Sequence, residues 1–211
     1  MSDSRIHIGL RHDGDVFGIS MTEEEVQAVH KLQKENPEKY PSGAEGIMKA
    51  LRDIGGPIIR EILPEEIWVL DDFLYDAIFI PEGEPLPPRS IIENEDLQVY
   101  VRDFGIRADD RCLVAEISGK IVGAVWTRIM NDYGHLDNET PSLAISLYKE
   151  YRGKGIGTQL LSRMLERLRE DGYKQVSLSV QRANYAMRMY QKAGFEIVED
   201  RGDEVLMLHR L

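Results

Sequence analysis

Residues Arg152–Thr158 (RGKGIGT) have the composition of a phosphate-binding turn. They follow the apolar run Ser142–Tyr148 and precede a segment with helical apolar spacing, which places the glycines at the start of a helix. The first turn of a helix offers unpaired N–H groups and a partial positive charge. Glycine lets the backbone approach an anion closely, and Lys149, Arg152 and Lys154 add positive charge. The turn is therefore predicted to bind a phosphate group.

The glycine spacing separates three kinds of phosphate-binding turn. A P-loop requires lysine and then serine or threonine after its last glycine, whereas Gly157 is followed by Thr158-Gln159. A dinucleotide-binding turn requires Gly-x-Gly-x-x-Gly and an acidic residue at the end of the next strand. Here the third glycine comes one residue early, and the next strand ends at Val180-Gln181-Arg182. The pattern Arg/Gln-x-x-Gly-x-Gly/Ala fits without adjustment, although a lone glycine-rich turn can also be purely structural.

A second segment, Asn184–Phe195 (NYAMRMYQKAGF), follows one helix and one strand later. Together the two segments resemble the GNAT superfamily of N-acetyltransferases. Leu143–Thr158 is similar to the pyrophosphate-binding motif of that family. Asn184–Phe195 is similar to its second motif, Asn-x-x-Ala-x-x-x-Tyr-x-x-x-Gly-Phe, with Ala186 one place off. One departure is Lys149, which stands where the family often has a proline.

The resemblance implies an acetyl-CoA site and no metal. It implies that backbone amides of the turn hold the pyrophosphate and that the pantetheine arm lies beside the strand ending at Leu147 and Tyr148. An N–H of Leu147 or a neighbour would stabilise charge on the thioester oxygen, and Asn184 would bond the arm, although alone it would be only an N-cap. The implied cofactor-binding residues are Leu147, Tyr148, Arg152, Gly153, Lys154, Gly155, Ile156, Gly157, Thr158 and Asn184.

The resemblance also makes Tyr190 the proton donor to the departing thiolate, although such a tyrosine alone is more typical of packing. An attacking alkylamine has a pKa of about 10.4, so it must lose a proton to a base or to a water chain. The sequence leaves the base open among one residue of an earlier strand and four residues of a polar loop: Glu116, Asp132, His135, Asp137 and Glu139.

The composition restricts the class of protein. A chain of 211 residues that is 42% hydrophobic and 30% charged is typical of a soluble globular protein. The net charge of −11 disfavours nucleic-acid binding and mildly favours cationic partners, although acidity can serve solubility alone. There is no apolar run of membrane-spanning length and no secretion signal. The lone Cys112 is expected to be a small buried side chain. We therefore expect a cytoplasmic protein that binds neither nucleic acid nor a membrane.

The elements that must position these residues follow from periodicity and turn signals. From Pro57 onward, the sequence predicts strands at 57–63, 112–117, 120–129, 142–148, 175–180, 195–199 and 204–209, and helices at 64–79, 91–103, 156–169 and 184–192. Ser118-Gly119 is a hairpin turn, and 131–140 is a loop. Antiparallel hairpins followed by a strand–helix–strand crossover imply an α/β (α+β mixed-sheet) fold with helices on both faces. The resemblance makes this the GNAT-type acyl-CoA N-acyltransferase fold.

Gly55-Gly56-Pro57 is expected to separate an N-terminal extension, 1–56, from an acetyltransferase domain, 57–211. In the extension we predict strands at 5–10 and 15–20 around a turn. A helix capped by Thr22 and Glu25 should run to residue 35, and a second should cover 44–52. The extension holds no chemical motif, so packing on the main domain or on another subunit is its expected role.

These features favour an enzyme that transfers an acetyl group from acetyl-CoA to a primary amine of a small molecule or peptide. A non-catalytic acyl-CoA sensor would share the same site, and Tyr190 favours the enzyme over it. A magnesium-dependent phosphotransferase is the third option. The acceptor and the oligomeric state stay open, with a homodimer the commonest symmetric arrangement.

Overall fold

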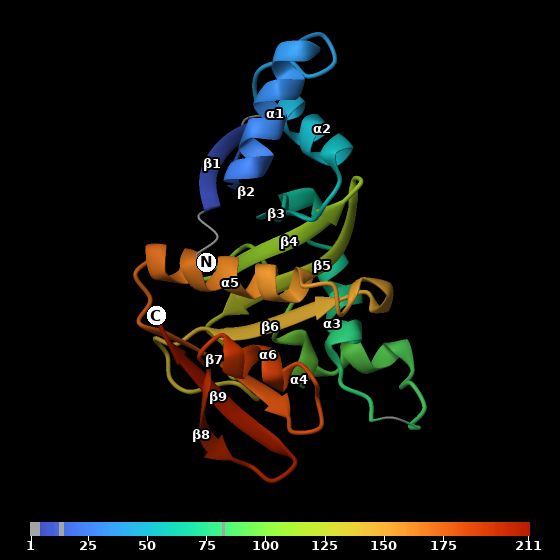
Figure 1. The fold of residues 1–211 in the computed structure, drawn as a ribbon. Coiled ribbons are helices and arrows are strands. Elements are labelled where there is room, and N and C mark those ends of the chain that lie inside the picture. The colour runs from blue at the N-terminus through green and yellow to red at the C-terminus, as the bar shows by residue number, and fades with distance from the viewer. Residues whose placement is uncertain (1–4, 13–14, 82) are drawn as a thin grey trace. The chain divides into compact units, whose positions relative to one another are not determined.

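The computed structural model describes residues 5–12, 15–81 and 83–211 (Figure 1). It contains two compact units. The first comprises the chain up to Leu63 together with Leu113–Val122, and the second comprises Pro64–Cys112 and Gly123–Leu211. The extension expected at 1–56 falls inside the first unit, which also takes 57–63 and 113–122 from the expected main domain. Among the described residues, no helix has the length and apolar character to span a membrane.

The first unit is built on antiparallel strands. β1 (Arg5–His12) pairs with β2 (Asp15–Thr22), β2 with β3 (Ile58–Glu61), and β3 with β4 (Arg111–Ile117). The predicted hairpin is confirmed with longer strands, and the middle of its predicted turn lies outside the described residues. The strand predicted at 57–63 is shorter than expected. β4 leads into the predicted hairpin turn, where Ser118 and Gly119 both have positive φ, 51° and 81°.

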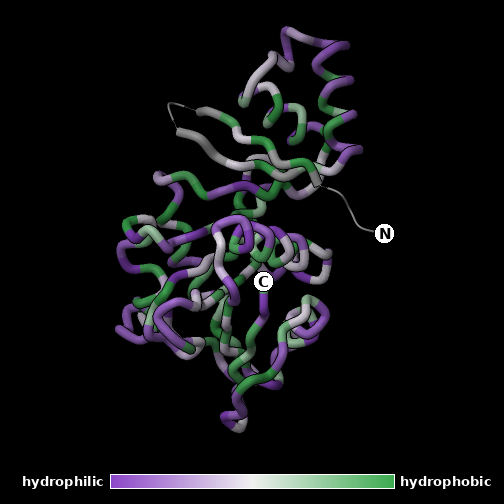
Figure 2. The backbone as a smooth tube through the Cα atoms, turned by 90° about the vertical axis from the view of Figure 1, so that its left-hand side faces the viewer, coloured by the Kyte–Doolittle hydropathy of each residue, from purple (hydrophilic) through white to green (hydrophobic). Residues whose placement is uncertain are grey.

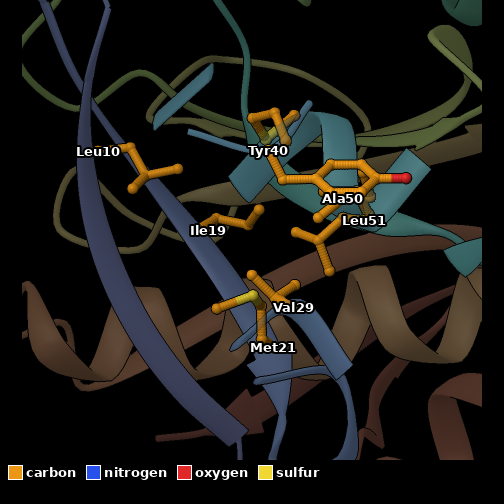
Figure 3. Packing of buried hydrophobic residues seen from close by; sticks show 9 residues of the cluster. Leu10, Ile19, Met21, Val29, Tyr40, Ala50 and Leu51 are labelled. Atoms are coloured by element: carbon orange, nitrogen blue, oxygen red, sulfur yellow. The ribbon is translucent and has the colours of Figure 1, made fainter. Parts of the chain in front are cut away.

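Two helices complete the first unit, α1 (Glu23–Glu35) and α2 (Ala44–Ile54). The predicted capping box is present, because Glu25 N–H donates to Thr22 Oγ1 at 3.1 Å and Thr22 N–H donates to Glu25 Oε2 at 2.7 Å. Hydrophilic positions recur along α1 (Figure 2), which buries only Val29. Side chains from both strands and both helices meet in one core (Figure 3): Leu10, Ile19, Met21, Val29, Tyr40, Ala50 and Leu51.

The second unit holds a mixed sheet, as predicted. Its strands follow the order β5 (Lys120–Arg128), β6 (Ser142–Leu147), β7 (Gln175–Gln181), β9 (Glu204–Arg210) and β8 (Glu196–Asp200). β6 and β7 are parallel, and the other neighbouring pairs are antiparallel. The crossover between β6 and β7 is α5 (Ile156–Glu170), which runs back along β6 in Figure 1. α6 (Met187–Lys192) is shorter than the predicted 184–192. Cys112 is buried, as expected.

The helix predicted at 64–79 is interrupted, and the one predicted at 91–103 is wrong. The first splits into η1 (Pro64–Glu66) and α3 (Val69–Ala77). The second is replaced by η2 (Arg89–Glu93), α4 (Glu95–Gln98) and a series of turns. Asn94 caps α4 by accepting from Asp96 N–H, and the chain takes positive φ at Asp103. A side chain from β5 binds main-chain carbonyls of this irregular segment.

That side chain is Arg128, which is fully buried. Its guanidinium donates to the carbonyls of Val99, Arg102 and Asp103 at 2.8–3.1 Å. It also pairs with Asp110 through two bonds, Nε to Oδ1 at 2.6 Å and Nη2 to Oδ2 at 2.9 Å. Burial alone would raise the pKa of Asp110, but the hydrogen bonds from Arg128 and Gly105 and the arginine charge lower it. The pair thus ties the irregular segment to the sheet.

Replacing Arg128 with methionine should lower the free energy of unfolding by about 3–5 kcal/mol, because Asp110 would keep a buried charge without its partner. Urea denaturation at neutral pH measures the loss. Arg102→Met is the matched control. Its ion pair with Glu95 has both side chains largely exposed, 49% and 78%, so the loss should stay below about 1 kcal/mol. Equal losses in the two variants would contradict an anchoring role for Arg128.

Candidate functional site

β6 and β7 separate soon after they meet. Their only paired residues are Ser142 and Ser177, and Ser177 N–H donates to Pro141 O at 3.0 Å. In contrast, all of β6 is paired with β5, from Ser142 opposite Arg128 to Leu147 opposite Gly123. Because backbone groups alternate in direction along a strand, Ile145 and Leu147 turn theirs toward β7. A gap with unpaired backbone groups therefore opens between the two strands.

The predicted phosphate-binding turn follows the end of β6 through η3 (Lys149–Tyr151). Gly153 and Gly155 take φ of 74° and 80°, and Gly155 is the N-cap of α5. The first helical bond runs from Gln159 N–H to Gly155 O at 3.1 Å. Within the described part of the chain, no group accepts from the N–H groups of residues 153–158. A side chain built at Gly153 or Gly155 would meet no atom within 4 Å. These N–H groups form an open cradle suited to an anion.

The Arg152 side chain bonds the main chain. Its guanidinium donates to Leu147 O at 2.8 Å and to Asp76 O at 3.0 Å. It therefore fixes the turn to the end of β6 and to the last turn of α3. The positive charge that stays near the cradle comes from Lys149 and Lys154, which are exposed. The Lys154 ammonium lies 5.5 Å from the centre of the Tyr151 ring.

The second predicted segment comes to the same place. A side chain at Gly157 would lie 3.3 Å from Leu147 Cδ1 and 3.4 Å from Met189 Sδ, so β6, the start of α5 and α6 converge there. Tyr148 packs on the Phe73 ring of α3, with centroids 4.9 Å apart. The structure thus brings both sequence motifs together at the open end of the gap.

Tyr190 lies within α6, and Asn184 lies just before that helix. Tyr190 is 7% exposed and packs against the Phe195 ring, with centroids 5.8 Å apart. Burial raises its pKa above the ordinary value, so the hydroxyl keeps its proton at neutral pH. Asn184 Oδ1 accepts from Ala186 N–H at 2.9 Å, which is the capping role weighed above. That bond leaves the side-chain amide of Asn184 as the group available to a ligand.

Glu116, one of the candidate bases, forms ion pairs with two arginines of the first unit. It is 1% exposed and accepts from Arg60 Nε at 3.0 Å and from Arg52 Nε at 2.5 Å. Burial alone would raise its pKa, but the bond from Arg52 and the charge of Arg60 outweigh it and lower the pKa. A carboxylate held between two guanidinium groups is a poor proton acceptor, so Glu116 is a structural residue.

The loop candidates differ in where they point. His135 Nδ1 lies 2.8 Å from Met130 O, and Glu139 is exposed. Asp137 accepts from Glu139 N–H at 2.9 Å, and its pKa is lowered by a hydrogen bond with Thr140. Two of them bond the sheet: Asp132 Oδ2 accepts from Ser142 Oγ of β6 at 2.7 Å, and Asp137 Oδ2 accepts a longer bond from Gln175 Nε2 of β7 at 3.5 Å. Three neighbouring polar residues, Tyr100, Ser146 and Ser179, carry no sequence pattern and were missed.

A mixed sheet that opens between two parallel strands, followed by an anion cradle at a helix start, is the fold of GNAT acetyltransferases. An acetyltransferase of this family from Streptococcus pneumoniae superposes with a TM-score of 0.54 at 23% identity, covering 74% of this chain and 100% of that one. The PaiA N-acetyltransferase of Thermoplasma acidophilum, solved with coenzyme A, gives 0.56 at 20% identity, covering 74% and 99%. The predicted fold is confirmed.

The chain belongs to the acetyltransferase (GNAT) family, whose model matches residues 74–195. Acetyltransferase SG1711 of Sodalis glossinidius is 35% identical over 101 residues, which are 47% of this chain and 63% of that protein. Mycothiol acetyltransferase of Propionibacterium freudenreichii is 33% identical over 82 residues, which are 38% of this chain and 26% of that protein. The chain thus spans less than two thirds of the length of these relatives.

Gly155→Ala should lower the free energy of unfolding by about 1–2 kcal/mol, because an L side chain disfavours the left-handed conformation at this N-cap. Thr158→Ala, an exposed change in the first turn of the same helix, should stay within about 0.5 kcal/mol. Chemical denaturation of both variants checks the difference. A Gly155→Ala variant as stable as the parent would mean that the turn does not hold this backbone conformation.

Proposed function

We propose that the protein transfers an acetyl group from acetyl-CoA to a primary amine. The observation that carries the proposal is the continuity of two sets of free backbone groups. The N–H groups of residues 153–158 have no acceptor among the described residues, and the strand that leads into them is not paired with β7 at Ile145 and Leu147, although Arg152 bonds the Leu147 carbonyl. This arrangement suits a long cosubstrate with a pyrophosphate at one end and an amide-bearing arm. Family membership supports the same assignment.

In the proposed site, main-chain amides would bind the pyrophosphate, and side chains would hold the turn and contact the arm. The amides of Gly153, Lys154, Gly155, Ile156, Gly157 and Thr158 would bind the pyrophosphate, while the Arg152 side chain holds the turn in place. Leu147 and Tyr148 would flank the arm, and the free amide group of Asn184 would bond it. When bound, acetyl-CoA supplies an activated acyl group. An N–H of Ile145 or Leu147 would stabilise charge on its carbonyl oxygen.

Tyr190 is the group best suited to protonate the leaving thiolate. Its hydroxyl carries a proton at neutral pH, so it can donate that proton to the thiolate as the C–S bond breaks. Tyr190 lies next to Met189, which contacts the turn and the end of β6. The acceptor would approach as an amine of a small molecule or a peptide.

Two measurements test the proposed function. Titration calorimetry should show that CoA binds and that ATP with magnesium does not. Release of free thiol from acetyl-CoA should then depend on an added amine. Binding of CoA without turnover across a broad panel of amines would instead support an acyl-CoA sensor. Failure to bind CoA would refute both ideas.

Tyr190→Phe should lower kcat by about 100-fold or more while leaving the Kd for CoA within about twofold, because phenylalanine keeps the packing and removes only the proton donor. Tyr185→Phe is the matched control. Tyr185 lies on the same segment but is 64% exposed, and its substitution should leave kcat unchanged. An unchanged kcat in Tyr190→Phe would remove Tyr190 from the reaction.

A further inference from the structure

One face of the sheet in the second unit carries buried polar side chains that lack partners. Trp126 Nε1, Ser146 Oγ and Ser179 Oγ are buried and bond to nothing in the described residues. Trp126 lies opposite Ala144, and Ser142 lies opposite Ser177. Side chains two residues apart share a face, so Ser146 and Ser179 lie on the same side of the sheet as Trp126. Unpaired buried polar atoms are uncommon, so these three call for a partner that the described residues do not supply.

The loop 131–140 brings a carboxylate to this face. Ser177 Oγ donates to Gly134 O at 2.6 Å, and a side chain at Gly134 would clash with Ser142 Oγ and lie 3.2 Å from Ser179 N. The loop is therefore pressed onto the end of the gap where β6 and β7 are joined. Asp132 is held there by Ser142 through Oδ2, while its Oδ1 is buried and has no partner in the described residues. Asp132 and Ser179 both lie beside Gly134, because a side chain built there would be 3.2 Å from Asp132 Oδ2 and 3.2 Å from Ser179 N.

The surroundings of Asp132 carry negative charge. Burial, the charge of the Asp132 carboxylate and a hydrogen bond between Tyr100 and Asp132 raise the pKa of Tyr100, and the charge of Glu204 adds to the effect. The nearby Arg201 is engaged by Glu199 at 2.8 Å and by Tyr133 O at 2.6 Å. Arg128, on the same face, is fully used by Asp110 and by backbone carbonyls. A cationic group would therefore find an acceptor at Asp132 and no competing free cation among these residues.

The position of this cluster matches the expected course of the cosubstrate. A pyrophosphate on the turn and an arm running along Leu147 and Ile145 would direct the reactive end toward the joined end of the strands. Asp132 and Ser179 lie at that end, beside Ser142 and Ser177. The cluster is thus where an attacking amine would have to arrive. This step rests on the proposed function.

We infer that Asp132 Oδ1, with Ser179 Oγ, binds the acceptor amine, and that the acceptor is an unbranched primary alkylamine that is cationic in solution. Both atoms are buried, and a slender group would disturb their surroundings least. The ammonium loses one proton to solvent, and its nitrogen lone pair then forms the C–N bond with the acetyl carbonyl carbon. The C–S bond breaks, Tyr190 gives its proton to the thiolate, and the second proton from nitrogen restores the Tyr190 hydroxyl. Asp132 orients the nitrogen by accepting a hydrogen bond from its remaining N–H.

The test compares amine kinetics in the full chain. The probes are 1-aminobutane, 1,4-diaminobutane and the branched 2-amino-2-methylpropane, with thiol release as the signal. Asp132→Asn should raise KM for the unbranched amines by about 10- to 100-fold and leave KM for acetyl-CoA within about twofold, because it removes a charge-assisted hydrogen bond. Asp137→Asn, an exposed change in the same loop, should leave both constants unchanged.

Two further variants separate binding from structure. Ser142→Ala removes the bond that holds Asp132 but keeps the carboxylate, and Ser179→Ala removes a hydroxyl that bonds nothing in the described residues. We expect Ser179→Ala to raise the amine KM and Ser142→Ala to change it less than Asp132→Asn does. Circular dichroism checks folding, and if Asp132→Asn does not fold, Ser179→Ala decides the question.

Several outcomes would overturn the inference. One is an amine KM unaffected by Asp132→Asn and Ser179→Ala. Another is a Ser142→Ala effect as large as that of Asp132→Asn, which would indicate a structural role. Equal use of the branched amine, or CoA binding by the parent without turnover of any unbranched amine, would also refute it. A parent protein that does not bind CoA would refute the proposed function itself.

Discussion

The chemistry of the second unit depends on one parallel bridge, that between Ser142 and Ser177. Had β6 and β7 paired along their length, the backbone groups of Ile145 and Leu147 would be satisfied within the sheet. Other segments lie at both ends of the gap. The loop containing Gly134 bonds Ser177 at the joined end, while Leu147 of β6 and Met189 of α6 both lie beside Gly157 of α5 at the open end. Unpaired backbone groups are costly when buried, so their persistence here is understandable if a ligand satisfies them.

Two arginines replace main-chain bonding where regular structure is lost. Arg152 bonds the last carbonyl of β6 and a carbonyl of α3, which would otherwise be left without partners at the opening of the gap. Arg128 does the same for three carbonyls of the irregular segment after α4, and Asp110 balances its charge. The planar guanidinium suits this role, because it presents several donors in a fixed geometry and never loses its charge. The open strand pair is therefore framed by arginine side chains that bond the main chain.

Local patterns in the sequence predicted the elements with local causes. Positive φ at Ser118 and Gly119, the capping box of α1 and the glycines before α5 all arise from residues a few positions apart. The helix predicted at 91–103 was wrong, and the irregular segment found there is bonded by Arg128, which is distant in the sequence. The same limit applied to the site. The meeting of Leu147, Gly157 and Met189 followed from two recognisable motifs, whereas the direction of Arg152 and the cluster of Tyr100, Asp132 and Ser179 depend on strand register and loop packing.

The two sides of the gap differ in whether main-chain or side-chain groups are available to a ligand. On the side of the turn, the groups available to a cosubstrate are main-chain N–H groups, which tolerate substitution provided that the glycines keep their conformation. On the opposite face, the available groups are side chains: a carboxylate oxygen from a loop and hydroxyls from β6 and β7. A change in that loop would alter the acceptor face without disturbing the turn. This separation explains how a family can keep one cosubstrate while its acceptors vary. It also explains why the turn was recognisable in the sequence and the acceptor face was not.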